Sequence, residues 1–260
     1  MLHKGEQIVS GSLRDLMVLN AVYQRAYPGW SHLSNTDDAV RSLIFPICLG
    51  KRMYDPESCF PATTRGNLRL ELDSGADGAG FDDVNLSVET IELIEATPRE
   101  YLKYVRQARD SVAGQFDATL PIGNPLLGIL LFDTGLGASD DEILSWGTVK
   151  ILKDNIEQYY PLSDYETLAG MLKTQMRAAH AIIGGHVHLT SEGGGAELVS
   201  DDMEQRVSTG DRGYAYLDFD PLRDGSYEME TAGAADVKIR GNGDEATAVR
   251  YYPIERVSVK

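Results

Sequence analysis

The chain has 260 residues, of which 42% are hydrophobic and 8% are aromatic. This length allows one large or two small domains, and this apolar content is enough for a buried core, which excludes a globally disordered chain. Its 24 lysines and arginines against 40 aspartates and glutamates give a net charge of −16, so we expect no direct binding to nucleic acid.

The segment before residue 97 has the pattern of strands and loops. Leucines alternate with charged residues over Leu68–Leu72, which predicts a half-buried strand. A second alternation covers Leu86–Ile94, and its change of phase near Glu89 indicates a β-bulge. Cys48 and Cys59 form neither a C-x-x-C pair nor a disulfide framework, and we interpret both as buried free thiols.

Two helices have clear start signals. Thr97–Glu100 is a capping box with a proline at the first helical position, and it predicts a connecting helix within residues 98–113. Ser163–Glu166 is a second capping box, followed by helical spacing until the glycine pair Gly184–Gly185. This second helix is predicted to span residues 164–182.

The later strands are the most apolar. Leu126–Phe132 is apolar on both faces, so it has to be covered by a facing sheet and by a neighbouring domain or subunit. It is also the longest apolar stretch, far short of the roughly 20 residues that span a bilayer. With no signal peptide at the start of the chain, we expect a soluble intracellular product. Three further strands are predicted at Tyr214–Phe219, Val237–Arg240 and Ala248–Val257.

The succession of predicted elements that begins near residue 55 is repeated near residue 220. Tyr54–Pro56 and Phe219–Pro221 each precede an irregular stretch, a strand, a Gly/Asp-rich loop and a second strand. This predicts two related β-domains, over residues 1–97 and 114–260, joined by the connecting helix of 98–113. The fold class is therefore all-β, with the helix of 164–182 inserted in the second domain.

One pattern suggests a metal site. His186, His188 and Glu192 have the spacing H-x-H-x3-E, which resembles the first metal-binding motif of cupins. The chain departs from that motif because His180 stands where a glycine is expected and no histidine follows His188. A cupin-like metal-dependent enzyme is therefore the alternative hypothesis, and exposed strand residues are the simpler one.

Other signals for chemistry are weak. Acidic clusters at Asp82–Asp83, Asp140–Glu142, Asp201–Asp202 and Asp218–Asp220 could bind Ca²⁺ at a subunit contact, but none matches an EF-hand loop. No phosphate-binding loop or G-x-S-x-G motif occurs. We predict no catalytic, cofactor-binding or metal-ligating residues and hence no enzyme. A carbohydrate-binding sandwich, supported only by an exposed pair Tyr214 and Tyr216, is a third hypothesis.

The apolar strands carry a family resemblance. Leu120–Phe132, followed by Thr148–Asn155 and the final Ile254–Val257, resembles the major capsid proteins of membrane-containing icosahedral double-stranded DNA phages. The resemblance covers residues 110–260 well and 1–97 only loosely. Because 260 residues is near the small end for that family, the single jelly-roll capsid subunits of related viruses remain an alternative.

The resemblance implies a double jelly roll, with two β-sandwiches in one chain, that self-assembles as pseudo-hexagonal homotrimers. It implies contacts with neighbouring trimers, with penton or minor capsid proteins and with an internal membrane. The expected location is the virion, after synthesis in the host cytoplasm, with genome handling left to other proteins.

Overall fold

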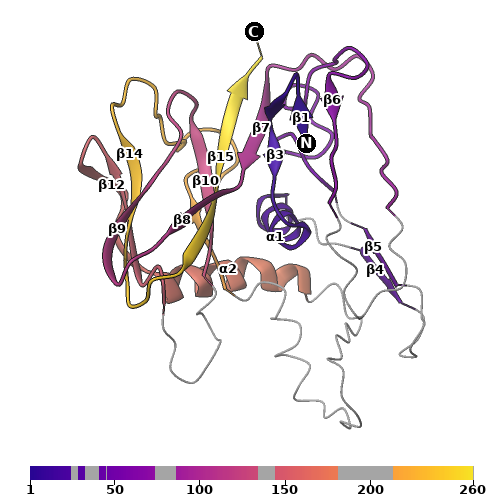
Figure 1. The fold of residues 1–260 in the computed structure, drawn as a ribbon. Helices are drawn as coiled ribbons and strands as arrows, with labels where there is room; N and C mark the ends of the chain where they lie inside the picture. Colours follow the sequence, from indigo (N-terminus) through magenta and orange to yellow (C-terminus); the bar gives the residue numbers. More distant parts are fainter. Residues whose placement is uncertain are drawn as a thin grey trace, which may run out of the picture.

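A computed structural model describes residues 1–24, 29–32, 41–44, 46–73, 86–133, 144–180 and 213–259. Most regular structure in them is β, arranged as two facing sheets with an N-terminal segment packed against one of them (Figure 1). Neither helix in the described part of the chain is long and apolar enough to cross a membrane.

Two sheets form the main body (Figure 1). The inner sheet has the order β13-β10-β15-β7-β3, and β8 pairs with the other half of β15. Its strands are β3 (Val9–Ser10), β7 (Glu100–Val105), β8 (Gln107–Asp110), β10 (Leu126–Phe132), β13 (Tyr214–Asp218) and β15 (Ala248–Ser258). The outer sheet has the order β12-β11-β14-β9, with β9 (Gly114–Thr119), β11 (Thr148–Lys153), β12 (Ile156–Asp164) and β14 (Val237–Gly243).

This strand order is that of an eight-stranded jelly roll. The pair β7 and β8 lies along β15 as one interrupted strand, because β15 pairs with β7 over its second half and with β8 over its first half. Counted so, each sheet has four main strands, and the chain crosses repeatedly between the sheets. That is the double-sheet pattern of a jelly roll. Residues 100–258 therefore hold one complete roll.

The inner sheet is buried on both faces. Ile129, Leu131 and Leu217 belong to the core between the two sheets. Leu130 and Tyr252, from the same sheet, belong to a second core on the opposite face. The prediction that Leu126–Phe132 is apolar on both faces because both are covered is confirmed, since every residue of β10 is buried.

The cover on the second face comes from the chain itself. Helix α1 (Leu13–Gln24) contributes Leu16, Leu19 and Val22 to the second core, where a neighbouring domain or subunit was predicted. Helix α2 (Tyr165–His180) begins where the second capping box predicts, and it lies across the ends of both sheets (Figure 1). Its Leu168 packs into the first core and its Leu172 into the second, so it ties the two cores together.

The remaining elements of the N-terminal segment are short. A three-stranded sheet contains β1 (Leu2–His3), β2 (Glu6–Gln7) and β6 (Leu68–Arg69), and a hairpin contains β4 (Gly29–His32) and β5 (Arg41–Ile44). The strand predicted at Leu68–Leu72 is thus reduced to its first two residues. The first jelly roll predicted for residues 1–97 stays a prediction.

The connecting helix predicted for residues 98–113 is wrong. This segment forms β7 and β8, and its backbone pairs with β15. Leu102 and Tyr104 point into the second core while their neighbours are half-exposed, which is a period of two. Burying that alternating face against the inner sheet outweighs a local cap signal, because most helix stability in proteins comes from tertiary packing. The strands of the roll therefore begin at Glu100, before residue 114 where the second β-domain was predicted to start.

The strand and bulge predicted for Leu86–Ile94 are also wrong. No residue of this segment lies in a strand, and Leu86, Val88, Ile91 and Ile94 are all exposed. In the described part of residues 1–97, the predicted repeat therefore lacks its counterpart of β15, and its counterpart of β14 is shortened to β6.

Candidate functional site

The three residues of the alternative cupin-like hypothesis, His186, His188 and Glu192, lie outside the described residues, as do the acidic clusters at 82–83, 140–142 and 201–202. In the described ranges, no three His, Cys, Asp or Glu side chains gather in a way that could hold a metal ion. Asp218 instead pairs with Arg223 at 2.8 Å, and Asp220 accepts a hydrogen bond from the Gly225 amide. These two carboxylates therefore stabilise a turn.

The tyrosine pair proposed for carbohydrate binding is buried. Tyr214 and Tyr216 are 0% and 5% exposed, and both pack in the second core. The proposed exposed aromatic pair is therefore wrong. Cys48 and Cys59 are free thiols as predicted, but only partly buried. Burial raises the pKa of Cys48 to about 11, so its thiol is protonated at neutral pH.

A buried carboxylate fastens helix α1 to the inner sheet. Asp15 is fully buried in the first turn of α1, where it forms a capping box with Ser12: the Ser12 hydroxyl donates to it at 2.6 Å and the Asp15 amide donates to that hydroxyl at 3.2 Å. The hydroxyls of Tyr214 on β13 and Tyr252 on β15 also donate to Asp15. Arg250 lies 3.5 Å away and completes this Asp15 anchor.

The surroundings of Asp15 stabilise its charged form. Burial by itself raises the pKa of this carboxyl, but the hydrogen bonds from Ser12, Tyr214 and Tyr252, together with Arg250, outweigh burial and hold the pKa below its ordinary value. Burial and the carboxylate also raise the pKa of both tyrosines, so they stay protonated donors. The anchor is thus a charged carboxylate that accepts hydrogen bonds from three hydroxyls and links α1 to two strands.

A second polar cluster joins the N-terminal segment to the roll. Glu228, whose side chain is 3% exposed, contacts Lys51 at 2.7 Å and Arg256 at 2.6 Å. Glu100 at the start of β7 contacts the same two cations at 3.2 and 3.3 Å. Two positive and two negative groups from four segments therefore neutralise one another.

Replacing Glu228 tests this cluster. Glu228→Gln removes the charge that holds Lys51 and Arg256, and we expect the free energy of unfolding to fall by about 1.5–3 kcal/mol, as for hydrogen bonds to charged groups. Urea unfolding of both proteins measures the difference. Glu71→Gln is the control, because its pair with Arg69 is mostly exposed and we expect little change. Equal effects of the two substitutions would contradict a buried cluster.

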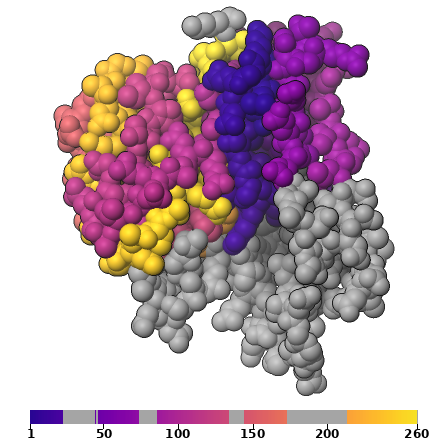
Figure 2. All heavy atoms as spheres, in the orientation of Figure 1, coloured from indigo at the N-terminus to yellow at the C-terminus, as the bar shows by residue number. Residues whose placement is uncertain are grey.

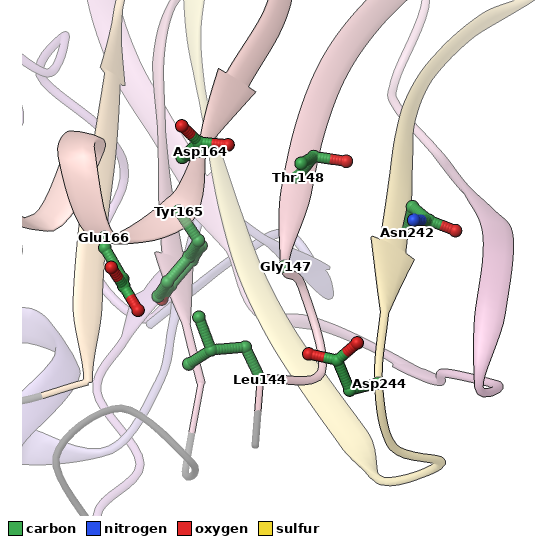
Figure 3. A pocket seen from close by; sticks show the side chains of 8 residues that line it. All are labelled: Leu144, Gly147, Thr148, Asp164, Tyr165, Glu166, Asn242 and Asp244. Atoms are coloured by element: carbon green, nitrogen blue, oxygen red, sulfur yellow. The ribbon is translucent and has the colours of Figure 1, made fainter. Parts of the chain in front are cut away.

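A recess of about 270 Å³ opens beside the start of α2 (Figure 3). Three of its side chains are acidic: Asp164, Glu166 and Asp244. Figure 3 shows them pointing in different directions, and no ligand set forms from them among the described residues. Tyr165 seals the inner wall, because its ring is buried and its hydroxyl donates to the Gly213 carbonyl at 2.8 Å. The acidic side chains of the recess therefore do not converge on one point where they could bind a ligand together.

The most unusual surface is residues 86–96, called here the arm, which belongs to the right-hand side of the molecule in Figure 1. It has no helix or strand, and no backbone hydrogen bond to it is seen in the described part of the chain. Ile91 and Ile94 are 69% and 92% exposed. A run of exposed aliphatic side chains on one segment is typical of an interaction surface.

Sequence reasoning missed helix α1 and the Asp15 anchor. Two signals could have found them. Ser12 and Asp15 have capping-box spacing, with aspartate in place of the usual glutamate, and Leu16, Leu19 and Val22 follow at helical spacing. The partners of Asp15, however, are about 200 residues away in sequence, and only folding brings them together.

No protein-family model matches the chain, and no curated protein matches it. Several solved structures are similar. The major capsid protein P2 of bacteriophage PM2 matches 63% of this chain and 46% of its own, at 10% identity and a TM-score of 0.40. The major capsid protein of Sulfolobus turreted icosahedral virus matches 61% and 41%, at 9% identity and a TM-score of 0.37. The PBCV-1 virus capsid matches 60% and 48%, at 10% identity and a TM-score of 0.34.

This chain thus spans less than half the length of each of these three solved structures. All three are viral capsid proteins, so the solved structures to which this chain is similar are of that kind.

Proposed function

We propose that this chain is a structural subunit of a viral capsid, the major capsid protein, and that it self-assembles as trimers. The observation that carries the proposal is the arm, because four exposed aliphatic side chains, Leu86, Val88, Ile91 and Ile94, lie within one short segment that has no helix or strand. Jelly rolls occur in viral capsids, lectins and cupins, so the roll admits this function without deciding it.

The proposal extends to partners and place. Neighbouring trimers, penton or minor capsid proteins and an internal membrane are its expected contacts, and the virion is its expected location after synthesis in the host cytoplasm. A net charge of −16 disfavours direct binding to the genome. A second jelly roll formed by residues 1–97 is part of the same proposal.

Size measurement tests the proposal. The full chain is purified, and light scattering and electron microscopy follow its mass and form as concentration rises. We expect trimers and, at higher concentration, larger ordered assemblies. A monomer at every concentration overturns the proposal. A stoichiometric transition metal that is lost in His186→Ala would instead support the cupin-like alternative.

A further inference from the structure

The strand β8 presents an open edge with two exposed arginines, Arg109 on the strand and Arg106 just before it. It pairs with β15 along one side, and in the described part of the chain no strand pairs with its other side. Arg106 and Arg109 are exposed and form no ion pair there. We call Arg106 and Arg109 with β8 the arginine edge.

The arginine edge also has an apolar neighbour. Val112, just after β8, is 49% exposed. Figure 1 places β8 on the near side of the molecule, and the corresponding atoms are on the surface in Figure 2. The edge also carries one acid, the exposed Asp110 at the end of β8, so its arginines outnumber its acids by two to one.

The arm has the opposite character. It carries three glutamates, Glu89, Glu92 and Glu95, and no lysine or arginine. None of the three has an ion-pair partner among the described residues. Its Val88, Thr90, Ile91 and Ile94 are β-branched, which favours a strand, yet its backbone pairs with no strand among the described residues.

We propose that the arm of one copy of this chain docks on the arginine edge of a second copy, adding a strand beside β8. Strand addition satisfies the open backbone groups of both segments, and the side chains supply selectivity. Successive side chains of a strand point to opposite faces, so Glu89 and Glu92 lie on opposite faces, as do Arg106 and Arg109. Both faces of the added strand can therefore pair acid with base.

We infer that the partner is a second copy of this chain because the charges of the two surfaces are complementary. The arm supplies glutamates and exposed aliphatic side chains, and the edge supplies arginines. The two surfaces are different patches of one molecule, so the contact is head-to-tail. Such contacts close into rings when the rotation permits and otherwise continue into larger assemblies. This inference rests on the proposed capsid function and names the contact that would build the shell.

A charge swap tests the inference on the full chain. One variant combines Glu89→Arg, Glu92→Arg and Glu95→Arg; a second combines Arg106→Glu and Arg109→Glu. We expect each to weaken self-association more than about tenfold, because like charges then face one another. The variant that carries all five substitutions is expected to regain self-association, because the pairs are restored with reversed sign.

A matched control carries the same change of charge elsewhere. Glu166→Arg, Glu230→Arg and Asp244→Arg change exposed acids outside the arm and the arginine edge, and this variant should associate like the unmodified chain. Light scattering measures association and circular dichroism checks folding. Unchanged association of the first two variants, or no recovery in the five-fold variant, overturns this contact while the capsid proposal stands. A monomeric unmodified chain overturns both.

Discussion

Asp15→Ala is expected to destabilise the protein by about 3–5 kcal/mol, the usual cost of removing one partner from a buried charged pair. The substitution leaves the Tyr214 and Tyr252 hydroxyls and Arg250 without their shared acceptor, and it also removes the capping box of α1. Total stabilities are typically about 5–15 kcal/mol, so this loss is a large fraction. Urea unfolding followed by tryptophan fluorescence measures it.

Two controls separate the charge from its hydrogen bonds. Tyr252→Phe removes one donor to a charged group and should cost about 1.5–3 kcal/mol. Asp244→Ala changes an exposed acid and should have little effect. An Asp15→Ala protein as stable as the Asp244→Ala control would show that α1 does not depend on this anchor.

The anchor also predicts a pH dependence. The pKa of Asp15 is lower in the folded protein than its ordinary value, so its contribution is complete above the unfolded pKa of about 3.9 and is lost as pH falls through the folded pKa. The stability difference between the unmodified chain and Asp15→Asn should therefore be constant near neutral pH and shrink in acid below about pH 4. A difference independent of pH in acid would contradict a charged Asp15.

Leu130→Ala and Leu131→Ala are expected to be about equally damaging, at about 2–5 kcal/mol each. The two residues are neighbours on β10 with opposite side-chain directions, and both are 0% exposed. Leu131 packs between the sheets, whereas Leu130 packs in the second core, to which α1 contributes. In a sandwich with one solvent-facing surface, one of the two would be exposed and its truncation nearly neutral.

Comparing Leu130→Ala with Leu131→Ala tests whether α1 stabilises the protein by covering the second face of the inner sheet. Ile156→Ala on β12 is the control, because Ile156 is 64% exposed and its truncation should change stability by less than about 0.5 kcal/mol. Urea midpoints of all three variants give the result. If Leu130→Ala behaves like Ile156→Ala, the second core contributes nothing to stability and α1 is not a structural cover.

The sequence by itself determined the strands of the roll that have a strong periodic pattern. Leu126–Phe132, Tyr214–Phe219 and Val237–Arg240 were all predictable, because alternation and apolar runs report burial directly. Helix α2 was predictable from its capping box, whose signal is local. The β-rich fold class follows from these elements.

Only the tertiary structure decided what covers each face and which segments meet. Residues 100–110 carry a helix start signal, yet pairing with β15 makes them strands, because long-range burial outweighs a local cap. The same holds for the second face of β10, whose cover is α1 from the far end of the chain. Hydrophobic periodicity indicates that one face of a strand is buried, but it does not identify the element that covers this face. That element is determined by contacts between residues that are distant in sequence. For that reason the sequence alone shows neither the Asp15 anchor nor the arginine edge.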